Sequence, residues 1–395
     1  MYFGLMIAIF VIGYAMIALE HPLKINKSAT AVLLAAVIWA VFALFGPGIK
    51  DGALIHHLGE TAEILFFLLG AMTIVEIVDK HDGFSIITDR ITTTSKRKLL
   101  WIISILTFFM SAVLDNLTTS IVMCALLRKL VADKNTRWFF AGMVILAANA
   151  GGAWSPIGDV TTIMLWIKGN ITAGGIILET IIPSLVSLLV PVAIIGMTMK
   201  GKLERPEKTE SEETSTVTRK QSLIILIMGV GLLLFVPFFK TITHLPPYLG
   251  ILFGLGILWI TTEIMHKNNP TNYSRLNVTA IIQKVDVPSV LFFLGILMAV
   301  SCLNEAGHLG QLAGALNELG NVYVINIVIG VLSSIIDNVP LVAAAMGMYP
   351  IEAIGNFAVD GAFWEGLAYC AGTGGSLLII GSAAGVAVMG MEKID

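Results

Sequence analysis

Residues Ser111 to Met123 read S-A-V-L-D-N-L-T-T-S-I-V-M, and residues Ser333 to Met346 read S-S-I-I-D-N-V-P-L-V-A-A-A-M. Each stretch places an Asp-Asn pair inside an apolar run. An aspartate in such surroundings is costly, and it is by default a candidate functional group. Because the same costly pair occurs twice, the sequence indicates that one acidic device has been duplicated.

Two further landmarks repeat in the same order around these pairs. Downstream, G-G-A-W-S-P-I-G-D from Gly151 matches the glycine spacing of G-G-S-L-L-I-I-G-S from Gly374. Upstream, I-L-F-F-L-L-G-A-M, ending at Met72, resembles V-L-F-F-L-G-I-L-M, ending at Met298. The offset between the copies is nearly constant, so we interpret the chain as an internal duplication.

The composition is that of a polytopic membrane protein. The chain is 56% hydrophobic and 13% charged, whereas soluble domains are about 25% charged. Its mean hydropathy is +0.87. Apolar stretches long enough to cross a bilayer run over residues 2–19, 28–45, 61–79, 174–199, 221–239, 247–265 and 287–304. We interpret the first as a span and not as a cleaved signal peptide, because it lacks a basic leading region.

Shorter apolar pieces lie between these spans, and they predict interrupted helices. The arms on either side of Asp115-Asn116 look too short to cross, which favours a re-entrant hairpin over residues 98–131. Gly151-Gly152 followed by Pro156 predicts a helix broken into two halves over 137–168, because proline is tolerated at a helix start. The second copy predicts a hairpin over 321–349 and a broken helix over 361–391.

The expected fold is an all-α polytopic membrane protein with two inverted-topology repeats. Each repeat carries a re-entrant helical hairpin and a broken transmembrane helix. The expected divisions are scaffold helices over 1–59, a first repeat over 60–200, a cytoplasmic linker over 201–219, connecting scaffold helices over 220–285 and a second repeat over 286–395.

The distribution of basic residues predicts the orientation in the membrane. All but three of the 24 Lys and Arg residues fall in loops that this topology places in the cytoplasm, and the exceptions are Lys50, Lys168 and Lys240. Cytoplasmic loops carry such an excess. We therefore expect an external N-terminus, a cytoplasmic C-terminus and an odd number of crossings between the repeats.

The embedded polar residues predict a site for a hard cation. No Lys or Arg falls in a predicted span core, so we expect the charge of the buried acids to be offset by a cation, a proton or helix N-termini. Carboxylate, amide, hydroxyl and freed carbonyl oxygens bind such cations. The candidate ligands are Asp115, Asn116, Thr118, Thr119, Ser155, Asp159, Thr161, Thr162, Asp337, Asn338, Thr373 and Ser376. A desolvated aspartate could alternate between a proton and Na⁺.

Purely structural roles for the same residues are alternatives to cation binding. An Asp-Asn pair could be a turn with a local helix cap, and Asp159 could be a carboxylate favoured by a helix N-terminus. Thr161 and Thr162 could bond to their own helix. The three cysteines show no metal-ligand spacing. Among the histidines, His56, His57 and His308 are candidates for tuning a pH response.

At these motifs the sequence resembles the NhaD-type sodium/proton antiporters of the ion transporter superfamily, which also contains arsenite permeases and divalent-anion symporters. The resemblance rests on S-A-V-L-D-N-L-T-T, G-G-A-W-S-P-I-G-D-V-T-T, S-S-I-I-D-N-V-P-L and G-T-G-G-S-L-L-I-I-G-S-A-A-G. It implies Na⁺ or Li⁺ export in exchange for protons by a homodimer in the cell (inner) membrane. It points to Asp115, Asn116, Ser155, Asp159, Thr162, Asp337 and Asn338 as ligands of the transported Na⁺ or Li⁺.

The resemblance implies no enzyme activity, no cofactor beyond the transported ions and no nucleic-acid partner. A permease for arsenite or a dicarboxylate is the alternative within the superfamily. Symporters of organic anions there typically carry Ser-Asn-Thr at the hairpin tips, where this chain has aspartates that would repel an anion. An intramembrane aspartyl protease is a further alternative, but Leu114 and Ile336 stand where such enzymes carry tyrosine before the aspartate.

Overall fold

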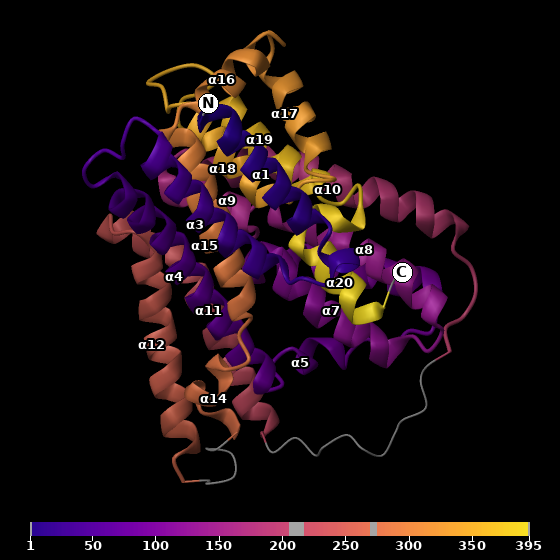
Figure 1. Ribbon diagram of the computed structural model, residues 1–395. Helices are drawn as coiled ribbons and strands as arrows, with labels where there is room; N and C mark the ends of the chain where they lie inside the picture. The colour runs from indigo at the N-terminus through magenta and orange to yellow at the C-terminus, as the bar shows by residue number, and fades with distance from the viewer. Residues whose placement is uncertain (1, 205–216, 269–274, 394–395) are drawn as a thin grey trace. The chain divides into compact units, whose positions relative to one another are not determined.

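The computed structural model describes residues 2–204, 217–268 and 275–393, and over these residues its regular structure is helical apart from two isolated β-bridges (Figure 1). The all-α membrane fold is therefore confirmed. Most of the predicted linker 201–219 lies outside the described residues.

The predicted spans are confirmed as helices. They are α1 (Tyr2–Ala18), α3 (Lys27–Phe45), α4 (Ala53–Lys80), α10 (Ala173–Thr198), α11 (Arg219–Thr243), α12 (Pro247–His266) and α15 (Val287–Glu305). Local signals set their ends: the side chain of Asn26 caps α3, and Thr218 forms a capping box with Gln221 at the start of α11. Within the described residues, seven helices are long and apolar enough to cross a membrane, namely α3, α4, α6, α10, α11, α12 and α15.

The predicted interruptions are also present. The first hairpin consists of α6 (Lys96–Leu114) and α7 (Asn116–Leu130), and the first broken helix of α8 (Lys134–Gly152) and α9 (Val160–Lys168). In the second copy the corresponding elements are α17 (Val322–Leu332) with α18 (Asn338–Met348), and α19 (Ala362–Gly374) with η1 (Ile379–Gly381) and α20 (Ala383–Glu392).

Two features differ from the sequence expectation. Helix α6 has 19 residues and is long enough to cross a membrane, so the prediction that both hairpin arms are too short to cross is wrong for α6. Helix α16 (His308–Asn317) was not expected, and it is bent by 120° against α17. The re-entrant nature of the hairpins and the inverted relation of the repeats stay predictions.

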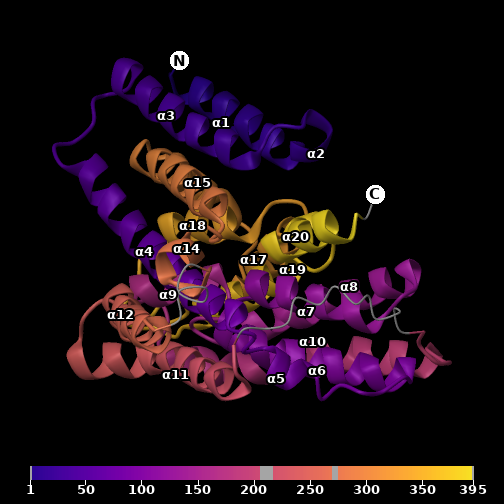
Figure 2. The ribbon, with the colours of Figure 1, turned by 90° about the horizontal axis from the view of Figure 1, so that it is seen from below.

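The helices pack into two compact units that interleave along the chain. Unit 1 comprises Met1–Phe66, Val160–Thr180 and Asp286–Ala383, and unit 2 comprises Phe67–Asp159, Ile181–Val285 and Ala384–Asp395. In unit 1, α3 packs on α1 and α15, α17 packs on α19, and α18 contacts α9, α15, α16 and α19. The pairing of α1 with α3 is visible in Figure 2. Short helix α2 (Glu20–Leu23) contacts α1.

Unit 2 is built around the first hairpin. Helix α8 packs against both of its arms, α6 and α7. Helix α11 contacts α6, α12 and the short α5 (Ser85–Thr88), and α12 contacts α14 (Val278–Ile282). The two hairpins therefore belong to different units, and each packs on the first half of its own broken helix.

The two copies share one packing device between hairpin and broken helix. A methyl group on Gly151 would overlap the carbonyl oxygen of Phe108, and one on Gly374 would overlap that of Gly330. The Ser111 hydroxyl donates to the Ala148 carbonyl (2.6 Å). In the second copy the Ser333 hydroxyl donates to the Ala371 carbonyl (2.7 Å). Backbone contacts of this kind require the small residues that the sequence repeats.

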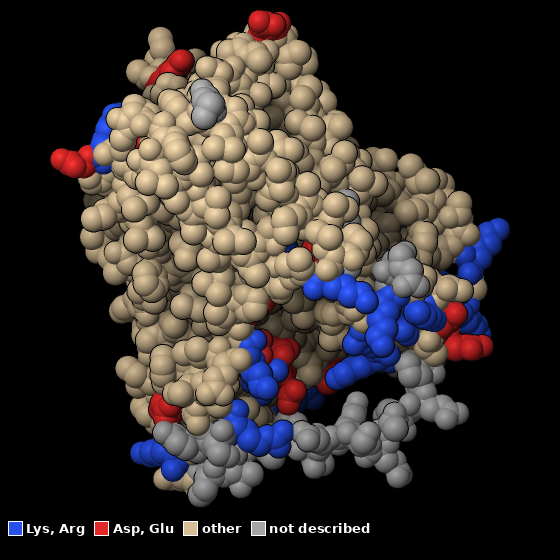
Figure 3. Space-filling view, viewed as in Figure 1, with Lys and Arg blue, Asp and Glu red and all other residues tan. Residues whose placement is uncertain are grey.

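Large apolar side chains are exposed along several predicted spans, including Leu33, Ile182, Ile227 and Phe238. Much of the face in Figure 3 carries no charged side chain. An exposed apolar surface of this extent is typical of a membrane-facing protein, which agrees with the polytopic fold.

A buried carboxylate fixes the end of α20 to the first hairpin region of unit 2. Glu392, whose side chain is 1% exposed, accepts hydrogen bonds from Arg128 Nε (2.8 Å) and Arg137 Nε (2.7 Å). The Trp138 indole donates to its backbone carbonyl (2.9 Å). Charge-assisted bonds of this kind are among the stronger hydrogen bonds in proteins.

We therefore expect Glu392→Gln to lower the thermal stability of the purified protein by several degrees, because it leaves two arginines without a negative partner. The measurement is the apparent melting temperature in detergent. Glu318→Gln, at an exposed position after α16, is the matched control and should melt like the wild type. Equal melting of both variants would contradict the anchoring role.

A buried histidine pair in unit 2 gives a pH prediction. His81, just after α4, lies with its Nε2 3.0 Å from that of His266, and its Nδ1 lies 2.7 Å from the Ile77 carbonyl oxygen. Burial lowers the pKa of His81 to about 4 from its usual 6.5. The folded protein thus keeps His81 neutral at pH values where the unfolded chain protonates it.

Because the unfolded state binds more protons in this range, His81 should cost stability as the pH falls from about 6.5 to about 4. We expect His81→Gln to lose less melting temperature than the wild type between pH 7 and pH 5. His244→Gln, at an exposed position, should follow the wild type. Parallel pH profiles for wild type and His81→Gln would show that His81 does not contribute.

Candidate functional site

The first helix break, between α6 and α7, is at Asp115, whose backbone conformation is strained. Its φ of 70° and ψ of 161° lie in a region that residues other than glycine rarely adopt. Its carboxylate accepts hydrogen bonds from the Thr118 N–H and the Thr118 hydroxyl, both at 2.8 Å. Asp115 is therefore the N-cap of α7, as the structural reading of the motif expects. Strain at such a position is often retained for function.

A buried cluster of polar side chains lies next to this break in unit 2. The Asn116 amide nitrogen donates to Asn149 Oδ1 (2.9 Å) and to Asp159 Oδ2 (2.6 Å). The three residues are 4%, 0% and 1% exposed, respectively. The cluster joins the hairpin, the end of α8 and the segment that leads into α9. It gathers carboxylate and amide oxygens, which are the ligand types that hard cations prefer.

Ser155, in the segment between α8 and α9, bonds to the first hairpin. Its hydroxyl donates to the Ala112 carbonyl (2.5 Å), which lies in the last turn of α6. Residues 153–159 are not helical, so they free backbone groups near Asp159. Of the predicted ligands, Asp115 is bonded to Thr118 and Asn116 to Asp159, and Ser155 lies in the same region with its hydroxyl on Ala112. Thr119 lies buried in the first turn of α7.

The second helix break has a different environment, which lies in unit 1. Asp337 caps α18 by accepting from the Val339 N–H (3.1 Å), and its own N–H donates to the Tyr14 hydroxyl (2.9 Å). Lys27 Nζ lies 3.8 Å from Asp337 Oδ2. The expectation that the embedded acids have no basic partner is therefore wrong for Asp337. It failed because Lys27 stands at the start of α3, outside the predicted span core.

The remaining predicted ligands are placed less specifically. Thr161 and Thr162 are fully buried in the first turn of α9, and Asn338 is buried at the start of α18. The Thr373 hydroxyl donates to the Tyr369 carbonyl of its own helix (2.6 Å), as its structural reading expects. Ser376 follows the end of α19. Because the two breaks belong to different compact units, a single shared site stays a prediction.

The sequence reading missed several residues. Asn149 stands two positions before Gly151-Gly152 in the buried end of α8, and its amide in an apolar helix was an available signal. Glu365 on α19 is also buried, with 5% of its surface exposed, and its position inside the predicted broken helix 361–391 was an available signal. Tyr14 and Lys27 could not be found, since their contacts with Asp337 span most of the chain.

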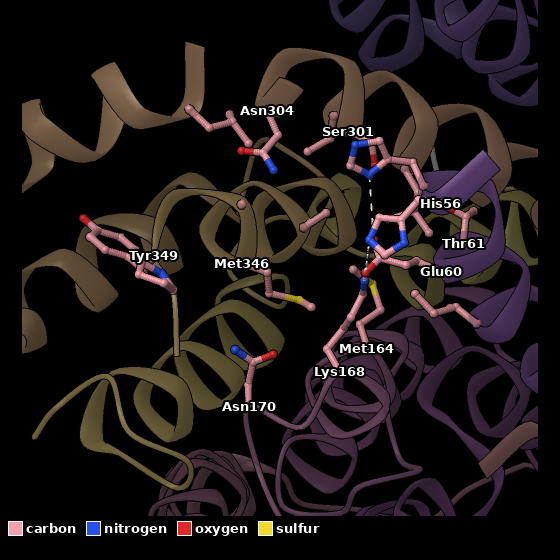
Figure 4. Close-up of a pocket in the computed structure, with 18 of the residues that line it drawn as sticks. His56, Glu60, Thr61, Met164, Lys168, Asn170, Ser301, Asn304, Met346 and Tyr349 are labelled. Atoms are coloured by element: carbon pink, nitrogen blue, oxygen red, sulfur yellow. Dashed lines mark ion pairs between the residues drawn. The ribbon is translucent and has the colours of Figure 1, made fainter. Parts of the chain in front are cut away.

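A cavity of about 350 Å³, lined by both polar and apolar side chains, lies in unit 1 between α4, α9, α15 and α18 (Figure 4). Glu60 forms ion pairs with Lys168 and with His56 (3.5 Å) and His57 (3.7 Å). Glu305 pairs with His57 (3.4 Å) and Lys50 (3.5 Å). Lys50 and Lys168, two of the three basic residues expected outside, are thus paired with carboxylates, and His56 and His57 contact the same carboxylates. Their role in a pH response stays a prediction.

Within the described residues no three His, Cys, Asp or Glu side chains gather as a metal site. The polar clusters at the helix breaks combine carboxylates with amides and hydroxyls instead. Such mixed oxygen ligands suit a hard cation better than a soft transition metal.

Comparisons with known proteins agree with this architecture. The family model described as a citrate transporter matches residues 5–372. The chain is 49% identical to sodium/proton antiporter 1 of Arabidopsis thaliana over 99% of this chain and 67% of that protein. It is 45% identical to sodium/proton antiporter 2 of the same plant, over 99% of this chain and 93% of that protein.

A bacterial relative is itself an NhaD antiporter by name. The chain is 32% identical to the Na⁺/H⁺ antiporter NhaD of Alkalimonas amylolytica, over 98% of this chain and 84% of that protein. Together with the twin Asp-Asn breaks, these matches show that the chain is a multi-pass membrane protein that belongs to the citrate transporter family and, within it, to the NhaD-type antiporters of the ion transporter superfamily.

Proposed function

We propose that this protein is a secondary active transporter that exports Na⁺ or Li⁺ in exchange for protons by alternating access. The observation that carries the proposal is the buried contact of Asn116 with Asn149 and Asp159 at the first helix break. The names of the plant and bacterial relatives support the same exchange. No enzymatic step is needed for this activity.

The proposed ligands are the oxygen-bearing side chains at the two breaks. They are Asp115, Asn116, Ser155 and Asp159 with Thr162 for the first motif, and Asp337 with Asn338 for the second. Asn116 uses its amide hydrogens on Asn149 and Asp159, which leaves its carbonyl oxygen as an acceptor. Asp159 is then held in one orientation while it binds either a cation or a proton.

Exchange follows because a proton and Na⁺ cannot occupy the same carboxylate at the same time. A buried carboxylate without a compensating charge is unfavourable, so Asp115, which forms no ion pair with a described Lys or Arg, requires either a proton or a cation, and we assign the same alternation to Asp159. Na⁺ arriving from one side displaces the protons, and protons arriving from the other side displace Na⁺. If two aspartates titrate for each Na⁺, net charge moves, and the membrane potential contributes about 2.3 kcal/mol per charge per 100 mV.

The orientation and assembly belong to the same proposal. We place the N-terminus outside and the C-terminus in the cytoplasm of the cell (inner) membrane, with the protein acting as a homodimer. The excess of basic residues in the expected cytoplasmic loops supports this orientation. Pairing of Lys50 and Lys168 with Glu305 and Glu60 supports it further, since it reduces the positive charge of the expected external side.

Citrate uptake is the second candidate, because the matching family model describes a citrate transporter. The charge at the first break argues against it. Asp115 and Asp159 approach the same buried region of unit 2, and among the described residues no Lys or Arg forms an ion pair with Asp115. A citrate anion would be repelled by these two carboxylates.

Everted membrane vesicles test the two candidates directly. We expect addition of Na⁺ or Li⁺ at pH 7 to 9 to release protons from the lumen, and labelled citrate to stay outside. Asp115→Asn, Asp159→Asn and Asp337→Asn should each abolish the proton release, because an amide cannot exchange a proton for a cation. Asp89→Asn, at an exposed position after α5, should retain it. Sodium-driven citrate uptake without proton release would overturn the proposal.

The buried amide of Asn149 gives a graded prediction. Asn149→Ala removes one of the two acceptors of the Asn116 amide, and loss of a buried hydrogen bond costs about 1–3 kcal/mol. We expect the apparent KM for Na⁺ to rise about tenfold, with folding retained. Asn135→Ala, at an exposed position of the same helix, should leave the KM unchanged. A wild-type KM in Asn149→Ala would remove Asn149 from the site.

A further inference from the structure

The second helix break carries a basic residue that the first break lacks. Lys27, the first residue of α3, places its Nζ 3.8 Å from Asp337 Oδ2, and the two side chains are 16% and 11% exposed. The Lys27 ammonium lies 4.4 Å from the centroid of the Phe292 ring. All three residues lie in unit 1, so the contact is internal to one compact unit.

The geometry of the pair allows it to separate. The distance exceeds the range of about 2.7–3.2 Å for a direct N–H···O hydrogen bond, so charge attraction holds the groups together. The Phe292 ring offers the ammonium a second favourable contact. Glu20 also lies close to Lys27, since its Oε1 accepts the Lys27 backbone N–H (3.1 Å). The lysine can therefore leave Asp337 without becoming an isolated buried charge.

The first break lacks this arrangement. There Asp115 accepts two hydrogen bonds from Thr118, and within the described part of the chain no Lys or Arg forms an ion pair with it. An incoming cation would therefore meet different groups at the two aspartates. At Asp337 an incoming Na⁺ meets an ammonium that already occupies one side of the carboxylate.

We propose that Lys27 is a specificity-determining counter-ion that competes with Na⁺ for Asp337 and so sets the cation affinity of the transporter. The ammonium pairs with Asp337 when no cation is bound, and when Na⁺ binds it leaves the carboxylate and keeps its contact with the Phe292 ring. The proposal rests on the proposed function, in which Asp337 is a cation ligand. It assigns to Lys27 a role in positioning charge and no direct contact with the transported ion.

Two substitutions of Lys27 should change the affinity in opposite directions. Lys27→Met keeps the unbranched stem and removes the charge, so the apparent KM for Na⁺ should fall about tenfold, within the usual range of coupling between two sites. Lys27→Arg adds a guanidinium that can pair with a carboxylate in a bidentate manner, so the KM should rise. A purely structural role would impair both variants in the same direction.

The measurement is the Na⁺ dependence of proton release in everted vesicles. Lys24→Met, at an exposed position three residues earlier, is the matched control and should keep the wild-type KM. An unchanged or raised KM in Lys27→Met would overturn the role of Lys27. If that variant does not fold, Lys27→Arg decides alone, and an unchanged or lowered KM overturns the proposal.

A binding measurement separates this proposal from the proposed function. Na⁺ should raise the melting temperature of the purified protein, because a ligand of the folded state stabilises it. Half-maximal stabilisation should need less NaCl in Lys27→Met and more in Lys27→Arg, with choline chloride as the salt control. Absence of Na⁺-dependent proton release in the wild type would sink the proposed function. Wild-type exchange with identical Na⁺ dependence in all Lys27 variants would sink only the role of Lys27.

Discussion

Every helix interrupted inside a membrane must find partners for the backbone groups that the interruption frees, because hydrocarbon supplies none. Asp115 and Asp337 meet this requirement at the starts of α7 and α18, where each carboxylate accepts a backbone N–H. Serine hydroxyls supply donors for backbone carbonyls: Ser111 and Ser333 each donate a hydrogen bond to a carbonyl in the first half of a broken helix. The interrupted helices depend on these few side chains, and the glycines allow the backbones to approach closely enough for them to reach.

The same requirement explains which parts of the duplicated motif stay alike. The serines and the glycine pairs make equivalent contacts in both copies, and each aspartate caps the helix that follows it, so packing and capping alone are enough to retain these residues. The oxygen cluster is different. The positions of Asn149, Ser155 and Asp159 in the first copy correspond to Gly372, Leu378 and Ser382 in the second. Capping is therefore common to both breaks, whereas the buried amide and carboxylate cluster belongs to the first break alone.

The sequence predicted the helices and their interruptions because both leave local marks. Long apolar runs gave the spans, and Asp-Asn and Gly-Gly gave the breaks to within a few residues. The contacts of Lys27 and Tyr14 with Asp337 could not be predicted, since they join residues 310 and 323 positions apart in the chain. The two interleaved units were equally inaccessible, because their division passes through α4 and α10 and between α8 and α9, where the sequence has no linker.

The structural and functional readings of Asp-Asn therefore do not exclude each other. A cap uses an oxygen of Asp115 to bind a backbone N–H, and the strained backbone of that residue costs about 1–3 kcal/mol that a cap in ordinary geometry, such as Asp337, does not require. The strained copy lies beside the oxygen cluster, and the relaxed copy lies beside a lysine. The two breaks share one motif but differ in the neighbours of the aspartate: the first has the amide and carboxylate cluster, and the second has Lys27. Under the proposed function, the first therefore depends on an external cation or proton, whereas in the second the chain provides a cation of its own.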